Sequence, residues 1–208
     1  MLGNFFTGAG GNFSAGWDLS EGLSKGGVEA VRVWPEGVST LARLPVPTIA
    51  AIEGYCLGQG MLYAACCDLR VAAENAKLGF PEIQRGFFPS CGTSHAIVRL
   101  IGRARAKELM FLGQHVSAKQ AHHWGLVNRV VPAGMPLSAS LELAHSLAAG
   151  PGRALASLKA LIDAGGETSL DAALALEADL ARSMQDSPDA REGISAFNEG
   201  RPPDFVGT

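Results

Sequence analysis

Residues 48–68 read TIAAIEGYCLGQGMLYAACCD, and this stretch decides the fold. Its apolar, partly β-branched start predicts a buried strand. The turn Gly58-Gln59-Gly60 follows, and the small, uncharged residues after it predict a helix. Backbone N–H groups of the first helical turn therefore point toward a nearby pocket, where they suit a phosphate, a carboxylate or a developing oxyanion. Tight packing of the helix against the strand explains the same glycines equally well.

The composition of the chain excludes several classes of protein. With 208 residues, of which 47% are hydrophobic, the chain can bury a sizeable core. The formal net charge is −3 without a block of like charges, which gives no support to nucleic-acid or anionic-membrane binding. We find no apolar stretch long enough to span a bilayer and no secretion signal at the N-terminus, so we expect a cytoplasmic protein without a membrane partner.

Cysteines and histidines offer only weak candidate sites. The four cysteines are Cys56, Cys66, Cys67 and Cys91. Two are adjacent and most lie among apolar residues, which predicts reduced structural thiols rather than a disulfide framework. Cys91 and His95 could meet on one helix face as a thiolate pair, but nothing supplies a third, orienting group. His122 and His123 have no acidic or thiolate neighbour at ligand spacing, so we expect no metal site.

The chain changes character near Pro89. Before it, short apolar runs alternate with glycine and proline turns, and we expect strands at 48–53, 69–73 and 77–80. An amphipathic helix is expected at 28–44, interrupted or shifted by Trp34-Pro35. After Pro89 most of the sequence is helical, so the front half is β/α and the back half is α.

Helix signals in the back half are well marked. Apolar periodicity and glycine stops predict two helices that end before Gly102 and Gly113. Ser117 and Ser187 are N-cap residues for two more helices. The remaining expected elements are a strand at 126–131 and helices at 137–149, 153–164 and 170–184.

Two further segments could carry chemistry. Residues 7–19, TGAGGNFSAGWDL, form a glycine-rich turn without the G-x-G-x-x-G spacing of a dinucleotide site, and a solvent turn is the favoured interpretation of this segment alone. Glu82 follows a strand and is flanked by apolar residues, which disfavours its ionised form and suits a general acid or base. A glutamate that starts a helix after proline, or that pairs with Arg85, is the alternative.

Taken together and in order, these segments resemble the crotonase superfamily, also called the enoyl-CoA hydratase/isomerase family. The matching stretches are FSAGWDL at 13–19 with the family's F-x-A-G-x-D-L, AAIEGYCLGQG at 50–60 with A-A-[VI]-x-G-x-A-x-G-G-G, and 67–72 followed by 79–82 with C-D-x-R-[IV]-A and F-G-x-P-E. Residues 117–128 and 191–197 match later signatures of the family, so the resemblance covers nearly the whole chain.

The resemblance implies an α/β fold with a crotonase-like ββα spiral core over residues 1–133. A C-terminal helical region over residues 134–208 would build a homotrimer, often paired into a hexamer. The implied substrate is an acyl-CoA thioester, with coenzyme A as its carrier part and no further cofactor. Its enolate-like oxyanion would be held by the backbone N–H groups of Trp17 and Gln59, and Glu82 would be the catalytic acid and base.

The resemblance also implies a set of substrate- and CoA-binding residues. These are Ala15, whose carbonyl corresponds to a position that contacts the adenine, together with Asp18, Leu19, Leu57, Gly58, Pro81 and Phe197. The pocket wall is expected to include Trp17, Phe87 and Phe88, which hints at a bulky or aromatic acyl group.

Departures from the family pattern bear on the reaction. Hydratases of the family use two glutamates, and Leu62 stands where the first would be. A single carboxylate can still shuttle a proton between two carbons, as in the family's enoyl-CoA isomerases, so we expect isomerisation or another one-base reaction. An enoyl-CoA hydratase and a non-catalytic crotonase-like scaffold subunit are the alternatives.

Two other departures concern CoA binding. Gly200 replaces a lysine that the family often places near the CoA site of an adjacent subunit, which weakens contact with phosphate or adenine. The family's usual N-terminal turn is also absent, and residues 1–6 match only the remnant of a strand before the first motif. A misplaced start, a truncated chain and a reduced fold with impaired CoA binding are the three explanations.

Overall fold

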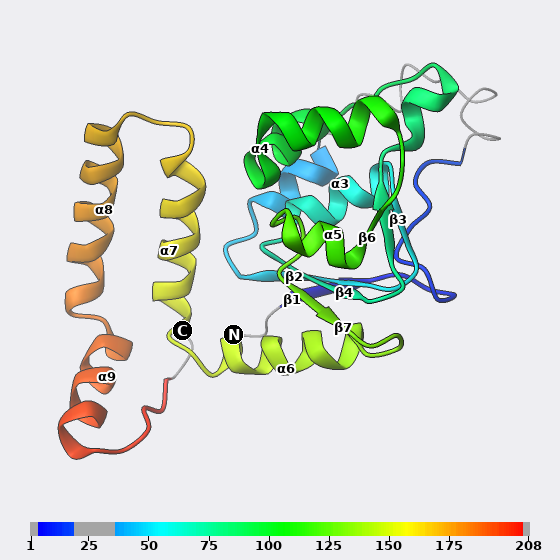
Figure 1. Ribbon diagram of the computed structural model, residues 1–208. Coiled ribbons are helices and arrows are strands. Elements are labelled where there is room, and N and C mark those ends of the chain that lie inside the picture. Colours follow the sequence, from blue (N-terminus) through cyan, green and yellow to red (C-terminus); the bar gives the residue numbers. More distant parts are fainter. Residues whose placement is uncertain (1–3, 19–35, 206–208) are drawn as a thin grey trace. The chain divides into compact units, whose positions relative to one another are not determined.

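The computed structural model describes residues 4–18 and 36–205, and it confirms the mixed α/β class (Figure 1). The described residues form two compact units. The larger unit lies within residues 5–44 and 48–141, and the smaller within residues 1–4, 45–47 and 142–208. The larger unit holds nearly all of the strands, and the smaller unit is mainly helical.

Two small sheets form the framework of the larger unit. The first has the order β1-β2-β4-β7, with bounds Asn4–Thr7, Thr48–Ile52, Leu69–Ala73 and Arg129–Val131. Strands β2, β4 and β7 pair in parallel. Every residue of β2 is buried, as its apolar sequence predicts.

The second sheet carries the turn that opens the sequence argument. Its order is β3-β5-β6, with bounds Tyr55–Leu57, Lys77–Gly79 and Val116–Ser117. Strands β3 and β5 are parallel, so the chain after Leu57 and the chain after Gly79 leave the same edge of the sheet. Helix α3 (Gln59–Cys66) begins after the first, and the 3-10 helix η1 (Pro81–Arg85) after the second. This register brings two segments that are distant in sequence to one place.

Arg70 fixes the far end of α3 to the first sheet. Its side chain is 3% exposed and is directed at backbone carbonyls rather than at a carboxylate. Its Nε donates to the Leu126 carbonyl at 2.8 Å, and its terminal nitrogens donate to the carbonyls of Ala64, Cys67 and Asp68. These bonds join the end of α3 to the start of β4 and to the segment before β7, and they supply a donor to each of these carbonyls.

Three helices follow in this unit or at its boundary. Helix α4 (Thr93–Leu112) is a single element with a break at Gly102, where φ is 77°, so the two expected helices are joined at the expected glycine. In α5 (Ala118–His123), the Ser117 hydroxyl accepts from the Gln120 N–H and confirms the N-cap. Helix α6 (Pro136–Ala148) crosses from the larger unit into the smaller one.

The strand expected at 126–131 is shorter than predicted. It begins only at Arg129, because the N–H groups of Leu126 and Val127 both donate to the Ala121 carbonyl and close the end of α5. Of the helix expected at 28–44, residues 36–42 are helical, and the part before residue 36 lies outside the described residues.

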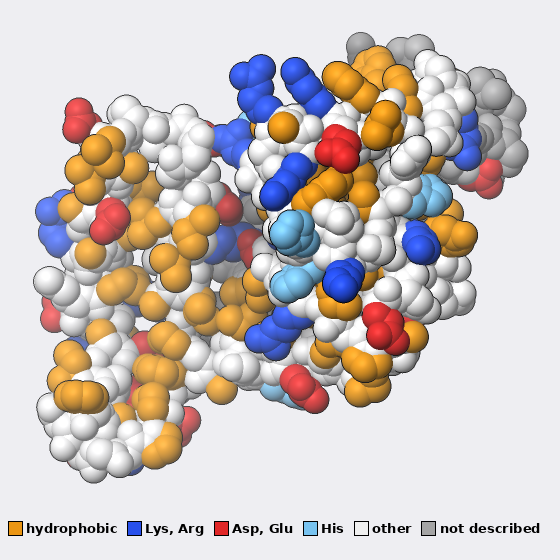
Figure 2. All heavy atoms as spheres, viewed as in Figure 1, with side chains coloured by type: hydrophobic (Ala, Val, Ile, Leu, Met, Phe, Trp, Pro, Cys, Tyr) orange, Lys and Arg blue, Asp and Glu red, His pale blue; other side chains and the backbone are white. Residues whose placement is uncertain are grey.

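The smaller unit consists mainly of helices. Its elements are α7 (Gly152–Gly165), α8 (Leu170–Gln185) and α9 (Pro188–Glu199), all close to their predicted bounds. Helices α7 and α8 form an antiparallel pair, and Ser187 caps α9 by accepting from the Ala190 N–H. Apolar side chains remain exposed along these helices (Figure 2); they include Leu158, Ile162, Leu170, Leu174, Ile194 and Phe197.

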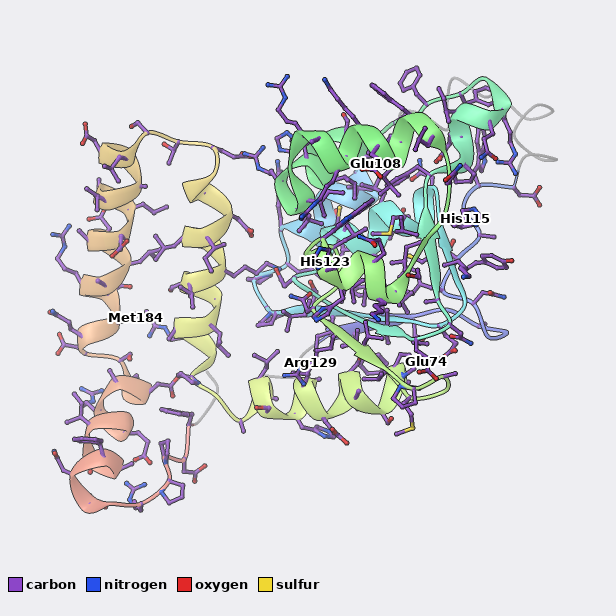
Figure 3. The ribbon with its side chains drawn as sticks, viewed as in Figure 1. Glu74, Glu108, His115, His123, Arg129 and Met184 are labelled. Atoms are coloured by element: carbon purple, nitrogen blue, oxygen red, sulfur yellow. The ribbon has the colours of Figure 1, made fainter. Side chains whose placement is uncertain are left out.

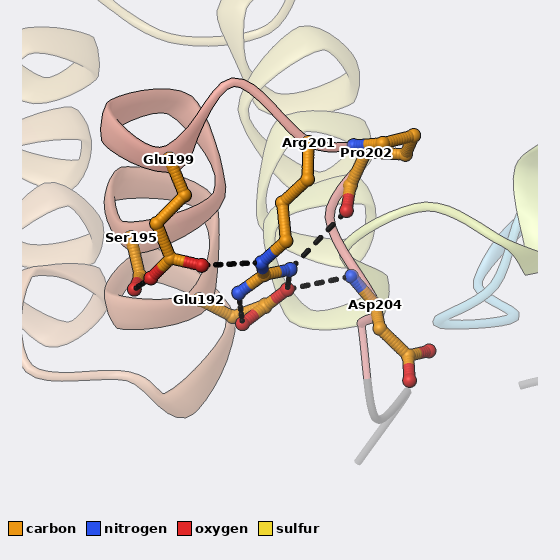
Figure 4. Close-up of polar contacts among 6 residues, drawn as sticks. All are labelled: Glu192, Ser195, Glu199, Arg201, Pro202 and Asp204. Atoms are coloured by element: carbon orange, nitrogen blue, oxygen red, sulfur yellow. Dashed lines mark hydrogen bonds and ion pairs between the residues drawn. The ribbon is translucent and has the colours of Figure 1, made fainter.

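A polar cluster closes the chain after α9 (Figure 4). The Arg201 guanidinium forms a two-bond ion pair with Glu192, at 2.6 and 3.0 Å, and its Nε donates to Glu199 at 2.7 Å. The same Glu192 carboxylate accepts from the Asp204 N–H at 2.7 Å. These bonds hold the segment after Gly200 against α9.

Candidate functional site

Two glycines bring the backbones of two motifs together. Gly16 has a φ of 93°, and a Cβ at this residue would lie 3.0 Å from the Leu57 carbonyl oxygen and 3.6 Å from the Gln59 nitrogen. The chain before Trp17 therefore runs directly against the turn at the start of α3. Only glycine permits both this conformation and this approach.

The segment before Gly16 is held by strand-like pairing with β3. The Ser14 N–H donates to the Tyr55 carbonyl at 2.9 Å, and the Leu57 N–H donates to the Ser14 carbonyl at 2.9 Å. The Ser14 hydroxyl accepts from the Gly16 N–H at 3.2 Å. The glycine-rich segment is therefore an ordered neighbour of β3, and the solvent-turn interpretation is wrong for residues 13–16.

Gln59 is the first residue of α3, and its backbone N–H faces away from the helical hydrogen bonds. The preceding N–H, that of Gly58, donates to the Gly79 carbonyl at 2.9 Å. For the Gln59 N–H, the structure records no acceptor among residues 4–18 and 36–205. The turn thus offers one main-chain donor, at the position named by the sequence.

Glu82 lies directly over this turn. A Cβ added to Gly58 would lie 2.8 Å from Glu82 Oε1. The same Cβ would lie 3.8 Å from the Gly16 Cα. Gly58 itself has φ 54° and ψ −122°, a backbone conformation that residues with a side chain rarely adopt. The three motifs of the sequence therefore meet within a few ångströms, through two glycines and one carboxylate.

The surroundings of Glu82 favour its protonated form. The side chain is half-buried, and this burial raises the pKa of its carboxyl group above the usual value, against smaller lowering effects from a backbone hydrogen bond and Arg85. Arg85 donates to the Pro81 carbonyl at 3.1 Å, and no ion pair joins its side chain to Glu82. The other alternative is confirmed, since Glu82 follows Pro81 in the first turn of η1. Oε2 of Glu82 is buried and has no hydrogen-bond partner in the described part of the chain. A carboxyl group whose pKa is raised in this way binds a proton more tightly, which suits a general acid or base.

The other predicted binding residues are distributed unevenly. Ala15, Asp18 and Trp17 are exposed, Leu57 is buried at the end of β3, and Pro81 precedes Glu82 on η1. Phe197 lies on α9 in the smaller unit and is 85% exposed. Leu19 lies outside the described residues.

Leu62 is fully buried on α3, one turn beyond the Gly58 turn. It brings no group that can ionise to this helix. Phe87 and Phe88, expected in the pocket wall, lie in the loop after η1 and are 51% and 76% exposed.

Sequence reasoning missed the contact between Gln59 and Cys91. The Gln59 Nε2 lies 3.7 Å from Cys91 Sγ, and Cys91 has a φ of 58°. His95 contacts Arg99 through Nδ1 at 3.3 Å, and no Cys91–His95 hydrogen bond occurs among the described residues. The glycine that follows Cys91 predicts a sharp turn into α4, but no signal in the sequence points to the contact with Gln59.

The remaining thiols and imidazoles form no second site. All four cysteines are unpaired, and burial raises the pKa of Cys66 to about 11 and that of Cys67 to about 12, so these thiols are unreactive at neutral pH. Within the part of the chain that the structure describes, no group of three metal-ligating side chains is found. Figure 3 shows His115 near β6 and His123 on α5, and the His115 ring makes an edge contact with Tyr55.

In the same described ranges, no helix is both long and apolar enough to cross a membrane.

Comparisons with known proteins agree with this arrangement. The family profile described as "Enoyl-CoA hydratase/isomerase" matches residues 5–208. The chain is 37% identical to 2,3-dehydroadipyl-CoA hydratase of Escherichia coli (strain K12), over 94% of this chain and 77% of that protein. It is 38% identical to 1,2-epoxyphenylacetyl-CoA isomerase of the same organism, over 97% and 79%. The solved structure of an enoyl-CoA hydratase from Bacillus anthracis superposes with a TM-score of 0.95 at 35% identity, over 100% of this chain and 82% of that one.

Proposed function

Since the chain belongs to the enoyl-CoA hydratase/isomerase family and has the crotonase fold, we propose that it moves a proton within an acyl-CoA thioester, using Glu82 as its single acid and base. The observation that carries this proposal is the position of the Glu82 carboxylate over Gly58, the residue before Gln59. Family members act on thioesters of coenzyme A, so the donor at the turn has a natural acceptor in the thioester oxygen.

In the proposed reaction, the thioester oxygen accepts hydrogen bonds from the backbone N–H groups of Trp17 and Gln59. Glu82 then removes a proton from C2 of a 3-enoyl-CoA, and the electron pair of that C–H bond spreads over the dienolate. The same carboxyl group returns the proton to C4, and the double bond moves to C2–C3. Glu82 ends as it began, and the net change is a shift of one proton.

The environment of Glu82 suits this cycle. Because burial raises the pKa of the carboxyl group, it holds the transferred proton long enough to deliver it to a second carbon. The two N–H groups stabilise charge that develops on the oxygen only during the reaction, and removing one such donor in other enzymes costs about 10²–10³ in rate.

Leu62 supports a one-base reaction over hydration. Addition of water calls for a second group that positions or activates the water, and Leu62 is a buried hydrocarbon on the helix where the family's first hydratase glutamate would lie. Enoyl-CoA hydration remains the alternative within the family, since relatives with both names match the chain. A non-catalytic scaffold subunit is the alternative outside enzymes.

The test is the proton shift on a 3-enoyl-CoA, measured for wild type, Glu82→Gln and the control Glu108→Gln. Glu108 is an exposed glutamate on α4. We expect Glu82→Gln to lose at least about 10²-fold in turnover and the control to retain it. Equal turnover in Glu82→Gln would refute the role of Glu82, and efficient hydration of a 2-enoyl-CoA would refute the preference for one-base chemistry.

The remaining expectations about binding and assembly are part of the same proposal. Leu57 precedes the Gly58 turn, Pro81 precedes Glu82, and Ala15 and Asp18 flank Gly16 and Trp17 in sequence; we propose that all four contact the CoA thioester. We also propose a homotrimer or hexamer built by the C-terminal helices, supported by the apolar side chains exposed on α7–α9. Light scattering of the intact chain would test the assembly, and calorimetric titration with an acyl-CoA would separate an enzyme from a scaffold that binds nothing.

A further inference from the structure

The loop between η1 and α4, residues 86–92, begins and ends with a glycine in the left-handed conformation. We call it the gate loop. Gly86 and Gly92 at its two ends have φ values of 77° and 87°. Cys91 has a φ of 58°, and it is the one non-glycine residue with a positive φ among those described. A cysteine held in this region carries strain that surrounding contacts must offset.

The gate loop is tied to the rest of the larger unit at few points. Its first two N–H groups donate back to η1, and the Ser90 carbonyl accepts from the start of α4. Among the described residues, the one hydrogen bond from residues 88–92 to another part of the fold joins Cys91 Sγ to Gln59 Nε2, at 3.7 Å. Phe87 and Phe88 meanwhile expose more than half of their side chains.

Two side-chain oxygens at the Gly58 turn are buried. Oε1 of Gln59 and Oε2 of Glu82 are both buried, and neither has a hydrogen-bond partner within the described ranges. A buried oxygen without a hydrogen-bond partner raises the free energy of the folded protein. A donor that reaches either of these oxygens would therefore lower it. A substrate atom reaches Glu82 Oε2 only after a movement that exposes it, either of the carboxyl group or of a neighbouring segment.

We propose that the gate loop opens to admit the acyl group, and that the contact between Cys91 and Gln59 is the latch that holds it closed. The proposal rests on the proposed function, because it takes the space beside Glu82 as the acyl site. Sulfur is a weak hydrogen-bond acceptor, so the latch is weak enough to open in each cycle. Gln59 then has two roles, with its N–H facing the thioester oxygen and its side chain controlling entry. Cys91 is a positioning residue that acts through Gln59.

The first experiment measures how fast a saturated acyl-CoA with an aromatic end binds, by stopped-flow tryptophan fluorescence. It compares wild type, Cys91→Ala, Cys91→Ser and the control Cys66→Ala, which removes another half-buried thiol at the end of α3. We expect Cys91→Ala to bind about two- to fivefold faster, because it loses the latch. Cys91→Ser keeps an acceptor for the Gln59 amide and should bind like wild type, as should the control. Equal association rates for Cys91→Ala and wild type would overturn the proposal.

The second experiment follows alkylation of Cys91 by iodoacetamide, read by peptide mass spectrometry. Iodoacetamide should label Cys91 several times faster in Gln59→Ala than in wild type, with added free cysteine in the same sample as the internal standard. Unchanged labelling of Cys91 would again refute the latch. Both readouts are independent of turnover, so loss of the proposed proton shift in wild type would count against the proposed function alone.

Discussion

Gly58→Ala is the substitution that tests the site most directly. The added Cβ would lie 2.8 Å from Glu82 Oε1, closer than nonbonded carbon and oxygen atoms approach. Glu82 is a flexible side chain, so its carboxylate can rotate away at small cost in stability. Rotation removes it from the Gln59 N–H and from the substrate. The reasoning therefore predicts a large loss of activity beside a moderate loss of stability.

The two magnitudes come from different features of the structure. Gly58 has φ 54° and ψ −122°, and a non-glycine residue in such a region costs about 1–3 kcal/mol. Loss of a positioned acid and base costs about 10²–10⁴ in rate. Urea unfolding measures the first effect, and turnover of a 3-enoyl-CoA measures the second.

Gly134→Ala is the matched control. Gly134 also has a positive φ, 80°, but a Cβ there would meet no atom within 4 Å. It should lose stability of a similar order through its backbone alone and keep its turnover. Turnover of Gly58→Ala within twofold of wild type would show that the carboxylate over Gly58 is not the reacting group.

Three further results are expected. Arg70→Met removes the side-chain hydrogen bonds to four backbone carbonyls and should lower the free energy of unfolding by about 2–4 kcal/mol in urea, whereas the exposed Arg103→Met should change it by less than about 0.5 kcal/mol. Burial raises the pKa of Glu82 above 4.5, so the contribution of the protonated Glu82 to folding stability is complete below pH 4.5 and is lost as the pH rises through the folded-state pKa. The stability of Glu82→Gln should therefore rise relative to that of wild type between about pH 4 and pH 8. A stability difference between the two proteins that stays constant with pH would contradict this. Arg201→Met removes exposed ion pairs to Glu192 and Glu199, so its small destabilisation should vanish in about 1 M salt, and persistence at high salt would contradict a screened interaction.

Local signals in the sequence were sufficient for most of the elements. Residues 48–52 and 69–73 form buried strands because most of their side chains are apolar and are more stable inside the protein than in water. Their bounds were predicted almost without error. Ser117 and Ser187 begin helices through a hydrogen bond between residues three apart, which is readable from sequence. The strand at 126–131 was predicted too long. The N–H groups of its first two residues donate to the Ala121 carbonyl at the end of α5, and this bonding depends on the tertiary structure.

Residue identity alone determined which groups of this chain can do chemistry: one carboxyl group in an apolar setting at Glu82, a helix-start N–H at Gln59, and a hydrocarbon at Leu62. Only the tertiary structure decided that Glu82 lies over Gly58, at the turn that leads into Gln59. Parallel pairing of β3 with β5 carries the chain ends after Leu57 and Gly79 to one edge, and Gly16 and Gly58 allow the backbones to approach there. The latch between Cys91 and Gln59 was likewise invisible in sequence, because it joins residues 32 positions apart through a single side-chain contact. Sequence patterns record local preferences, whereas such distances depend on how strands register and helices pack.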